Sequence, residues 1–362
     1  MTRSWPRLLG TVLCGFLLAG CRNPEKPKFR LGCLPFPGMF TLHDLADPDD
    51  LGTHRYEQTL PLVSGEEDRG ILYSCYAGFL DLAHVRDSID RTRYLAGRIE
   101  PVILDGDPTL IVKLAEPDKF VLTFTYPSDW RVMAAQERES LAHELALLLA
   151  QELAWISTTW HEIITFYGYK STVIIPEDQS SFTYDDMVSH IVGMQVAAAA
   201  LRDPDRDFNV AATAALEQRL KELGVVTEHQ CGDAIRAVEG LWWGGGDSYK
   251  RQLDIGFDDG EIMPWLVPDF EPCGSVIADP MLLPSLETLR GRDFSDFMTV
   301  EIAPNFVEWD SVQSLLPGDP PPERVRPYEH FPIIMEDIRA RLIRVLGENC
   351  DRPDVANVKP QD

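Results

Sequence analysis

The sequence predicts an α+β fold in which helices predominate, and three observations support this prediction. Most patterned segments have the apolar spacing of helices, and only one pair of neighbouring segments alternates as β-strands do. The strand–helix alternation of a doubly wound parallel sheet is missing. One long segment is apolar almost all round in its middle, which indicates a buried helix. We therefore expect a single large domain around a buried long central helix, with a β-hairpin and a few short strands.

The composition limits the classes of partner. Of the 362 residues, 58 are acidic and 33 are basic, so the formal charge is −25. Such a surface repels phosphate backbones, and no basic block interrupts it. The chain is 44% hydrophobic and 25% charged, as folded globular proteins are. We therefore expect a folded protein that binds no nucleic acid.

The N-terminus has the pattern of a lipoprotein signal peptide over residues 1–20. Arg3 and Arg7 precede an apolar stretch, residues 8–18, that is shorter than the roughly 20 residues needed to span a bilayer. The stretch ends in the letters LAGC, a bacterial lipobox whose last residue is Cys21. We expect cleavage before Cys21 and acylation of its thiol. An ordinary cleaved signal with a chance cysteine is the alternative.

Lipidation at Cys21 would anchor the mature chain to a membrane through acyl chains. Residue 22 is arginine rather than the aspartate that retains lipoproteins in the inner membrane. The sequence therefore predicts a periplasm-facing protein of the cell envelope. In a host with two membranes, it favours the outer membrane over the inner one.

The mature chain divides into three parts. Residues 21–66 are rich in proline and acidic turns, which indicates a lipidated tether and irregular segment. Residues 67–350 hold the periodic segments and form the globular domain. Residues 351–362 are a loose polar tail.

The first half of the domain supplies the strands and the central helix. A strand over 69–76 precedes a helix over 78–96. Two alternating segments, 109–114 and 119–126, flank the turn letters AEPD and predict a β-hairpin. The central helix covers 134–167 and ends at a glycine.

The second half is mainly helical. Asp185 and Asp186 suit the positive first turn of one helix, which also carries Gly193 and four consecutive alanines. These small residues predict close packing against another helix. The expected elements are helices over 183–201, 208–223, 228–240 and 332–347, and a strand over 297–302.

The first candidate for chemistry lies near the end of the central helix, in the letters HEIIT that begin at His161. Metalloproteases of the HExxH type have a second histidine four residues after the first, but here that residue is Thr165. The zincin motif is therefore broken, although Glu162 still follows His161 as a candidate base. The alternative is a structural histidine bonded to a neighbouring carbonyl or carboxylate.

Glu152 is a further candidate base, because it lies on an apolar stripe of the same helix. Burial there would raise its pKa, and perturbed carboxylates are common at catalytic sites. A buried salt bridge is the alternative, for instance with Arg86 or Arg93.

The second candidate is the pair Asp81 and His84, which share one face of a helix at positions i and i+3. Asp81 could orient His84 or bind a metal with it. If this helix crosses the central one, His161 completes a site for one divalent metal, with zinc the first choice. A solvated charged face is the alternative.

Cys75 supports a different interpretation, a thiol hydrolase or acyltransferase in which His84 removes the thiol proton. The spacing from Cys75 to Gly78 only loosely resembles the start of NlpC/P60 peptidases. A buried inert cysteine or a disulfide is the alternative.

Four blocks of the chain resemble a family of bacterial envelope lipoproteins that is catalogued as a domain of unknown function. The resemblance covers about residues 30–345 and brings no activity with it. It implies that the blocks around His84 and around His161 are shared by such proteins. The blocks are GFLDLAHVRDSIDRTRYLA, TTWHEIITFYGYKS, SSFTYDDMVSHIVG and GEIMPWLVPD.

These observations lead to three hypotheses. The first is a metal-assisted hydrolase that acts on a cell-envelope component, with Glu162 or Glu152 as general base. The second is a non-catalytic structural or scaffolding lipoprotein with a buried His/Glu polar network. The third is the thiol enzyme that depends on Cys75. Substrate, oligomeric state and disulfide pairing do not follow from the sequence.

Overall fold

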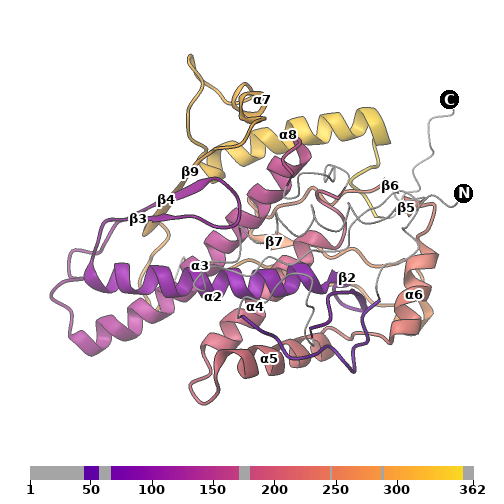
Figure 1. Ribbon diagram of the computed structural model, residues 1–362, viewed down its shortest axis with the longest axis horizontal. Helices are drawn as coiled ribbons and strands as arrows, with labels where there is room; N and C mark the ends of the chain where they lie inside the picture. The colour runs from indigo at the N-terminus through magenta and orange to yellow at the C-terminus, as the bar shows by residue number, and fades with distance from the viewer. Residues whose placement is uncertain (1–44, 57–66, 171–179, 245–246, 287–288, 354–362) are drawn as a thin grey trace, which may run out of the picture.

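The structure confirms the predicted fold class. Helices dominate, and the strands form small antiparallel sheets. The signal peptide and Cys21 lie outside the described residues, so their cleavage and lipidation stay predictions. The computed structural model describes residues 45–56, 67–170, 180–244, 247–286 and 289–353 (Figure 1).

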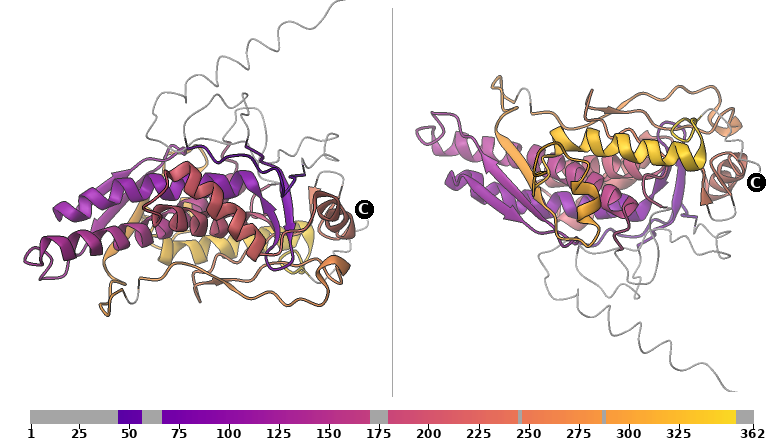
Figure 2. Two further views of the ribbon diagram at one scale, coloured as in Figure 1. Left: turned by 90° about the horizontal axis from the view of Figure 1, so that it is seen from below. Right: turned by 90° about the horizontal axis from the view of Figure 1, so that it is seen from above.

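Three helices form the centre of the domain: α2 (Leu82–Asp105), α3 (Ala135–Phe166) and α4 (Asp186–Leu201). α2 packs chiefly against α3 and α4, and Figures 1 and 2 show the three together in the middle of the molecule. α3 is the predicted central helix. Because its middle is apolar on every side, nearly all its side chains from Leu145 to Thr165 are buried.

The start of α2 differs from the helix expected over 78–96. Gly78–Asp81 form strand β2, which pairs antiparallel with β1 (Ile71–Ser74). Gly78 has a φ of 72°, a left-handed conformation that excludes it from a right-handed helix. Asp81 ends the strand and caps α2, which then continues well beyond residue 96.

α2 and α4 approach each other closely at Gly193, as its small side chain predicts. A Cβ atom on Gly193 would lie 2.2 Å from the carbonyl oxygen of Val85 and 2.6 Å from Cβ of Ser88. No other residue fits this contact without moving the helix backbones apart.

The predicted hairpin is present as β3 (Thr109–Val112) and β4 (Lys119–Phe124). A third strand, β9 (Met298–Ala303), pairs antiparallel with β4 and confirms the strand expected over 297–302. Figure 1 shows this sheet beside the C-terminal end of α2. The turn between β3 and β4 thereby reaches the helices and contributes Glu116 to the site described below.

The last helix begins earlier than expected. Pro327, rather than Pro332, stands at its start, because the first helical position tolerates a residue without an N–H.

The remaining elements are α5 (Phe208–Glu222), α6 (Glu228–Ala237), α7 (Trp309–Gln313), α8 (Pro327–Leu346), a 3-10 turn (Glu271–Cys273) and the paired strands β5 (Trp243–Gly244) with β6 (Asp247–Ser248) and β7 (Glu261–Ile262) with β8 (Met281–Leu282).

The packed domain begins before residue 67. Leu45 forms a β-bridge with Ile71, and Ala46 and His54 are fully buried. The described part of the predicted tether therefore belongs to the globular domain. Within the described segments, every helix is too short or too polar to cross a membrane.

Candidate metal-binding site

Polar side chains gather where α2, α3 and α4 meet, and we call this cluster the polar seam. Most of its members are buried beside the apolar core. His84 and His161 keep 29% and 26% of their side-chain surface exposed, so solvent reaches the seam at both. Its members are Asp81, His84, Ser88 and Arg91 around α2, Glu116 between β3 and β4, His161 and Glu162 of α3, and Asp185, Asp186 and His190 around α4.

One end of the seam holds three residues of metal-ligating type. One side-chain atom each from Asp81, His84 and Asp185 lies within 4.8 Å of the other two. Nδ1 of His84 is 3.8 Å from Oδ2 of Asp81 and 3.2 Å from Oδ1 of Asp186. This nitrogen is buried and lacks a hydrogen bond of good geometry. A ring nitrogen that faces carboxylate oxygens in this way fits a shared cation.

Hydrogen bonds between the N-termini of α2 and α4 assemble this group. Oδ1 of Asp81 accepts a hydrogen bond from the N–H of Ala83 at 2.7 Å, which caps α2. The N–H of Asp81 donates to Oγ of Ser189 at 2.9 Å, and that hydroxyl donates to the carbonyl of Asp185 at 2.6 Å. These bonds hold the start of α2 against the first turn of α4, so the two carboxylates come within reach of each other.

The charges in this group perturb one another. Burial disfavours protonated His84, but the carboxylates of Asp81 and Asp186 outweigh it and raise the pKa of His84 well above its usual value. Burial, followed by repulsion from Asp186 and Asp81, raises the pKa of Asp185 to about 8. A bound divalent cation would relieve this repulsion between crowded carboxylates.

His190 occupies the middle of the seam. Its Nδ1 lies 2.9 Å from Oγ of Ser88, and its ring centroid lies 5.1 Å from that of His84. Its Nε2 is buried, receives no hydrogen bond from the part of the chain that the structure describes, and lies 3.9 Å from Oε1 of Glu162. Burial and then the positive charge of His84 lower the pKa of His190 well below its usual value, so this ring is neutral at pH 7.

The other end of the seam is an ion-pair network around Glu116. Its Oε1 lies 3.2 Å from Nδ1 of His161 and 3.1 Å from Nη2 of Arg91. Burial disfavours ionised Glu116, but Arg91 and then His161 outweigh it and hold the pKa of Glu116 well below its usual range. Burial also disfavours protonated His161, yet the hydrogen bond and charge of Glu116 raise the pKa of His161.

The predicted metal ligands are only partly brought together. Asp81 and His84 lie side by side, as their spacing predicts, but the third member of the group is Asp185. His161 faces Glu116 instead, so the predicted set of Asp81, His84 and His161 is corrected at its third position. The physical reason is that hydrogen bonds hold the start of α2 against the first turn of α4, whereas Nδ1 of His161 faces the β3–β4 turn.

Glu152 belongs to a different part of the molecule. Its Oε1 accepts a hydrogen bond from the hydroxyl of Tyr328 on α8 at 2.7 Å. Ten residues of helix, about 15 Å, separate it from Glu162 along α3. Glu152 is therefore not a base for the polar seam, whereas Glu162 lies within it.

The structure also corrects the Cys75 alternative. Cys75 forms a disulfide with Cys273, so it has no thiol that could act as a nucleophile. Cys231 and Cys350 are buried and form no disulfide with any described residue. The thiol-enzyme hypothesis is withdrawn for this reason.

We expect the disulfide to be recovered from the native protein. Digestion without reduction should release a crosslinked pair of peptides that contains Cys75 and Cys273, and reduction should separate them. Mass spectrometry of the two digests is the measurement. Recovery of alkylated Cys75 from unreduced, folded protein would contradict the pairing.

Sequence reasoning missed Glu116, Asp185 and His190 as members of a site. Glu116 resembles an ordinary turn residue, and Asp185 resembles an ordinary acid at a helix start. A signal existed for His190, because this polar residue interrupts a helix that is otherwise apolar on most sides. A buried polar group of this kind needs a partner, and its partners in the structure belong to the seam.

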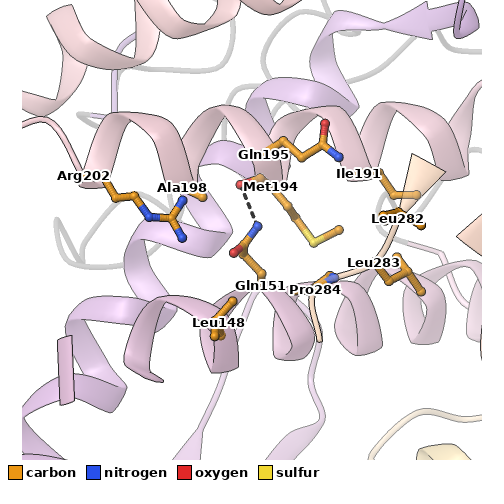
Figure 3. A pocket seen from close by; sticks show the side chains of 10 residues that line it. All are labelled: Leu148, Gln151, Ile191, Met194, Gln195, Ala198, Arg202, Leu282, Leu283 and Pro284. Carbon is orange, nitrogen blue, oxygen red and sulfur yellow. Dashed lines mark hydrogen bonds between the residues drawn. The ribbon is translucent and has the colours of Figure 1, made fainter. Parts of the chain in front are cut away.

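A cavity of about 300 Å³ lies elsewhere, between α3, α4 and the segment around β8 (Figure 3). Its lining is mixed, with the apolar side chains of Leu148, Met194 and Leu283 and with Arg202 at one side. Gln151 donates a hydrogen bond across it to the carbonyl of Met194 at 3.4 Å. None of its lining residues belongs to the polar seam, so we do not assign the chemistry of the seam to this cavity.

Comparison with known families identifies the family of this chain. The model of a family described as "Protein of unknown function (DUF4056)" matches residues 17–253, more than half of the chain. The chain belongs to the DUF4056 family. The whole polar seam falls inside the matched DUF4056 region, whereas Cys273 and β9 lie beyond it. No curated protein and no solved structure matches the chain.

Proposed function

We propose that this member of the DUF4056 family is a lipid-anchored, metal-dependent hydrolase that acts on a component of the cell envelope. The observation that carries the proposal is the juxtaposition of Asp81, His84 and Asp185 at the N-termini of two helices. Its location at a solvent-reachable end of a buried polar seam suits a catalytic centre better than a purely structural one.

The side chains present fit a divalent cation. Carboxylates and histidine are the common ligands of zinc, and catalytic zinc has three protein ligands with a fourth position left for water. The buried Nδ1 of His84, which lacks a hydrogen bond of good geometry, supports this fit. Zinc is our first choice and manganese the second, because two of the three ligands are carboxylates.

The residues of the chain supply the remaining chemistry. A zinc ion held by Asp81, His84 and Asp185 would lower the pKa of a water molecule and polarise the bond to be cleaved. Glu162 is the candidate general base, because it lies in the seam and its charge acts on both His84 and His161. Oε2 of Glu162 accepts a hydrogen bond from the N–H of Phe182 at 3.0 Å. The other carboxylate oxygen, Oε1, is then the one that would accept a proton from water.

Two observations support a location outside the cytoplasm. The Cys75–Cys273 disulfide is typical of proteins that fold in an oxidising compartment. The lipobox that ends at Cys21 supports an acyl anchor, and the proposed substrate is therefore an envelope component.

Metal binding tests the proposal directly. We expect the purified full chain, stripped of metal, to bind about one equivalent of zinc in a calorimetric titration. His84→Ala and Asp185→Asn should each weaken binding at least about tenfold, since each removes a ligand. His229→Ala is the matched control, because His229 also lies near a carboxylate but is 83% exposed on α6.

Two results would contradict the metal proposal. One is a folded wild-type chain that binds neither zinc nor manganese. The other is a pair of ligand variants that bind zinc as the wild type does. Asp185→Asn removes a negative charge with almost no change in side-chain shape. Its zinc affinity therefore tests the metal proposal even if His84→Ala fails to fold.

A non-catalytic scaffold is the second candidate function, and the network around Glu116 favours it. Arg91 donates hydrogen bonds to both Glu116 and Ser157, which joins α2, α3 and the β3–β4 turn as a structural group would. This candidate predicts a folded protein that binds no metal, so the zinc titration separates the two functions.

A further inference from the structure

His161 and Glu116 form an ion pair in which the Glu116 side chain is buried and the His161 side chain is partly exposed to solvent. Nδ1 of His161 lies 3.2 Å from Oε1 of Glu116 and is shielded from solvent; like Nδ1 of His84 it lacks a hydrogen bond of good geometry among the described residues, so the contact is an ion pair. The His161 side chain still has 26% of its surface exposed, so solvent reaches atoms of this side chain other than Nδ1. Nε2 lies on the side of an imidazole away from Nδ1 and is the nitrogen left to meet a ligand.

The carboxylate of this pair is fixed from a second direction. Arg91 of α2 donates to Oε1 of Glu116 at 3.1 Å and to Oγ of Ser157 at 2.9 Å. Ser157 lies one helical turn before His161 on α3. A buried carboxylate that holds Nδ1 fixes the orientation of the ring and leaves Nε2 for proton transfer.

We propose that His161 donates a proton from Nε2 to the leaving group of the substrate, with Glu116 as its positioning residue. This inference rests on the proposed hydrolase function. The oxygen of a water molecule bonds to the acyl carbon, and Glu162 takes the proton that the water loses. The bond from the acyl carbon to the leaving atom breaks, and its electron pair stays on the leaving atom. That atom takes the proton from Nε2 of His161.

The pair also points to a substrate class. A proton donor accelerates cleavage most when the leaving atom is strongly basic, as in amides and alkyl esters. A phenolate leaves readily without a proton. We therefore infer that the substrate bond is an amide or an alkyl ester.

The charge of His161 depends on groups from every element around it. Burial disfavours the protonated ring, yet the glutamates outweigh burial and raise its pKa, so the ring is ready to donate near neutral pH. The groups that face it are Glu116 of the β3–β4 turn, Arg91 of α2, Glu162 of α3, His190 of α4 and Tyr169 just after α3.

Nuclear magnetic resonance of histidine-labelled full chain, without added metal, tests the pair. The resonance assigned through His161→Gln should titrate with a midpoint above 6.5, and Glu116→Gln should lower this midpoint by about one pH unit. Glu100→Gln is the matched control. It removes a carboxylate that also lies 3.2 Å from a histidine Nδ1, at the exposed His143, and should leave the titration of His161 unchanged.

Chemical modification tests the accessibility of Nε2 in the wild-type chain. At pH 8, diethyl pyrocarbonate should acylate His161 and leave His190 and His54 unmodified, since those two side chains are almost fully buried. A titration midpoint at or below 6.5, no effect of Glu116→Gln, or protection of His161 equal to that of His190 would each overturn the proposal. The wild-type experiments decide the matter if Glu116→Gln does not fold.

A comparison of two probe esters tests the proton donation itself. With zinc bound, His161→Gln should slow hydrolysis of a methyl ester at least about tenfold more than hydrolysis of the matching 4-nitrophenyl ester. Equal loss on both esters overturns the role of His161. Failure of zinc binding would instead overturn the proposed function, and the metal-free resonance experiment would stay interpretable.

Discussion

Replacing Gly193 with alanine should lower the free energy of unfolding by at least about 3 kcal/mol, at the upper end of what overpacking costs. The new Cβ would meet the carbonyl oxygen of Val85 at 2.2 Å and Cβ of Ser88 at 2.6 Å. The carbonyl oxygen of Val85 is part of the α2 backbone, and Cβ of Ser88 is bonded directly to that backbone. Neither atom can move aside as the end of a flexible side chain could. The contact is relieved only if α2 and α4 separate.

Gly97→Ala is the matched control for this change. Gly97 lies on α2, and nothing approaches within 4 Å of the position that its Cβ would occupy. Alanine there should stabilise the protein by up to about 1 kcal/mol, because it removes the conformational entropy of a helical glycine. Urea unfolding, followed by circular dichroism, measures both variants. Similar effects at the two positions would show that α2 and α4 do not pack as described.

The same contact links stability to the proposed site. Ser88, which a Cβ on Gly193 would strike, is the partner of His190 in the polar seam. Separation of α2 from α4 would also move Asp185 away from Asp81 and His84. Any folded fraction of Gly193→Ala should therefore bind zinc more weakly than the Gly97→Ala control.

Much of the fold follows from periodicity alone. The apolar middle of α3 and the alternation of β3 and β4 depend on neighbouring residues, so local patterns predict them well. The start of α2 does not follow in this way. Phe79 and Leu80 suit a helix or a strand equally, and their pairing with β1 decides between the two.

The candidate site is predictable only where its residues lie close together in the sequence. Asp81 caps α2 and His84 is the third residue of that helix, so their proximity follows from the geometry of a helix start. Asp185 comes from the start of another helix, more than a hundred residues later. Gly193 predicts that α4 packs closely on a helix, but nothing near it in the sequence says that this helix is α2.

The network around Glu116 could not be predicted from the local sequence either. Glu116 lies in a turn between two strands, where an exposed carboxylate is the ordinary expectation. Arg91 and His161 each have an obvious alternative partner nearby in sequence. Only the placement of the hairpin beside α2 and α3 buries all three together.

Glu152→Gln should stabilise the protein by up to about 3 kcal/mol at pH 8 and by almost nothing at pH 4. Burial raises the pKa of Glu152 from its ordinary value of 4.5 to about 7, although a hydrogen bond from Tyr328 partly opposes the rise. Below pH 4.5 the carboxyl is protonated in both the folded and the unfolded chain, so it contributes no pH dependence. Between pH 4.5 and 7 the unfolded chain ionises first, which favours unfolding.

Above pH 7 the folded protein must hold a charge at this partly buried position, and the stability that is lost between pH 4.5 and 7 is not regained at higher pH. Glutamine has a similar shape and cannot ionise, so the difference between wild type and variant should grow from pH 4.5 to 7 and then level off. Glu139→Gln, the same change at an exposed position of α3, is the control and should give no such trend. Urea unfolding of the three proteins at pH 4, 6 and 8 supplies the comparison. A constant difference across this range would mean that the pKa of Glu152 is the same in the folded and the unfolded chain, so that its contact with Tyr328 or solvent offsets the effect of burial.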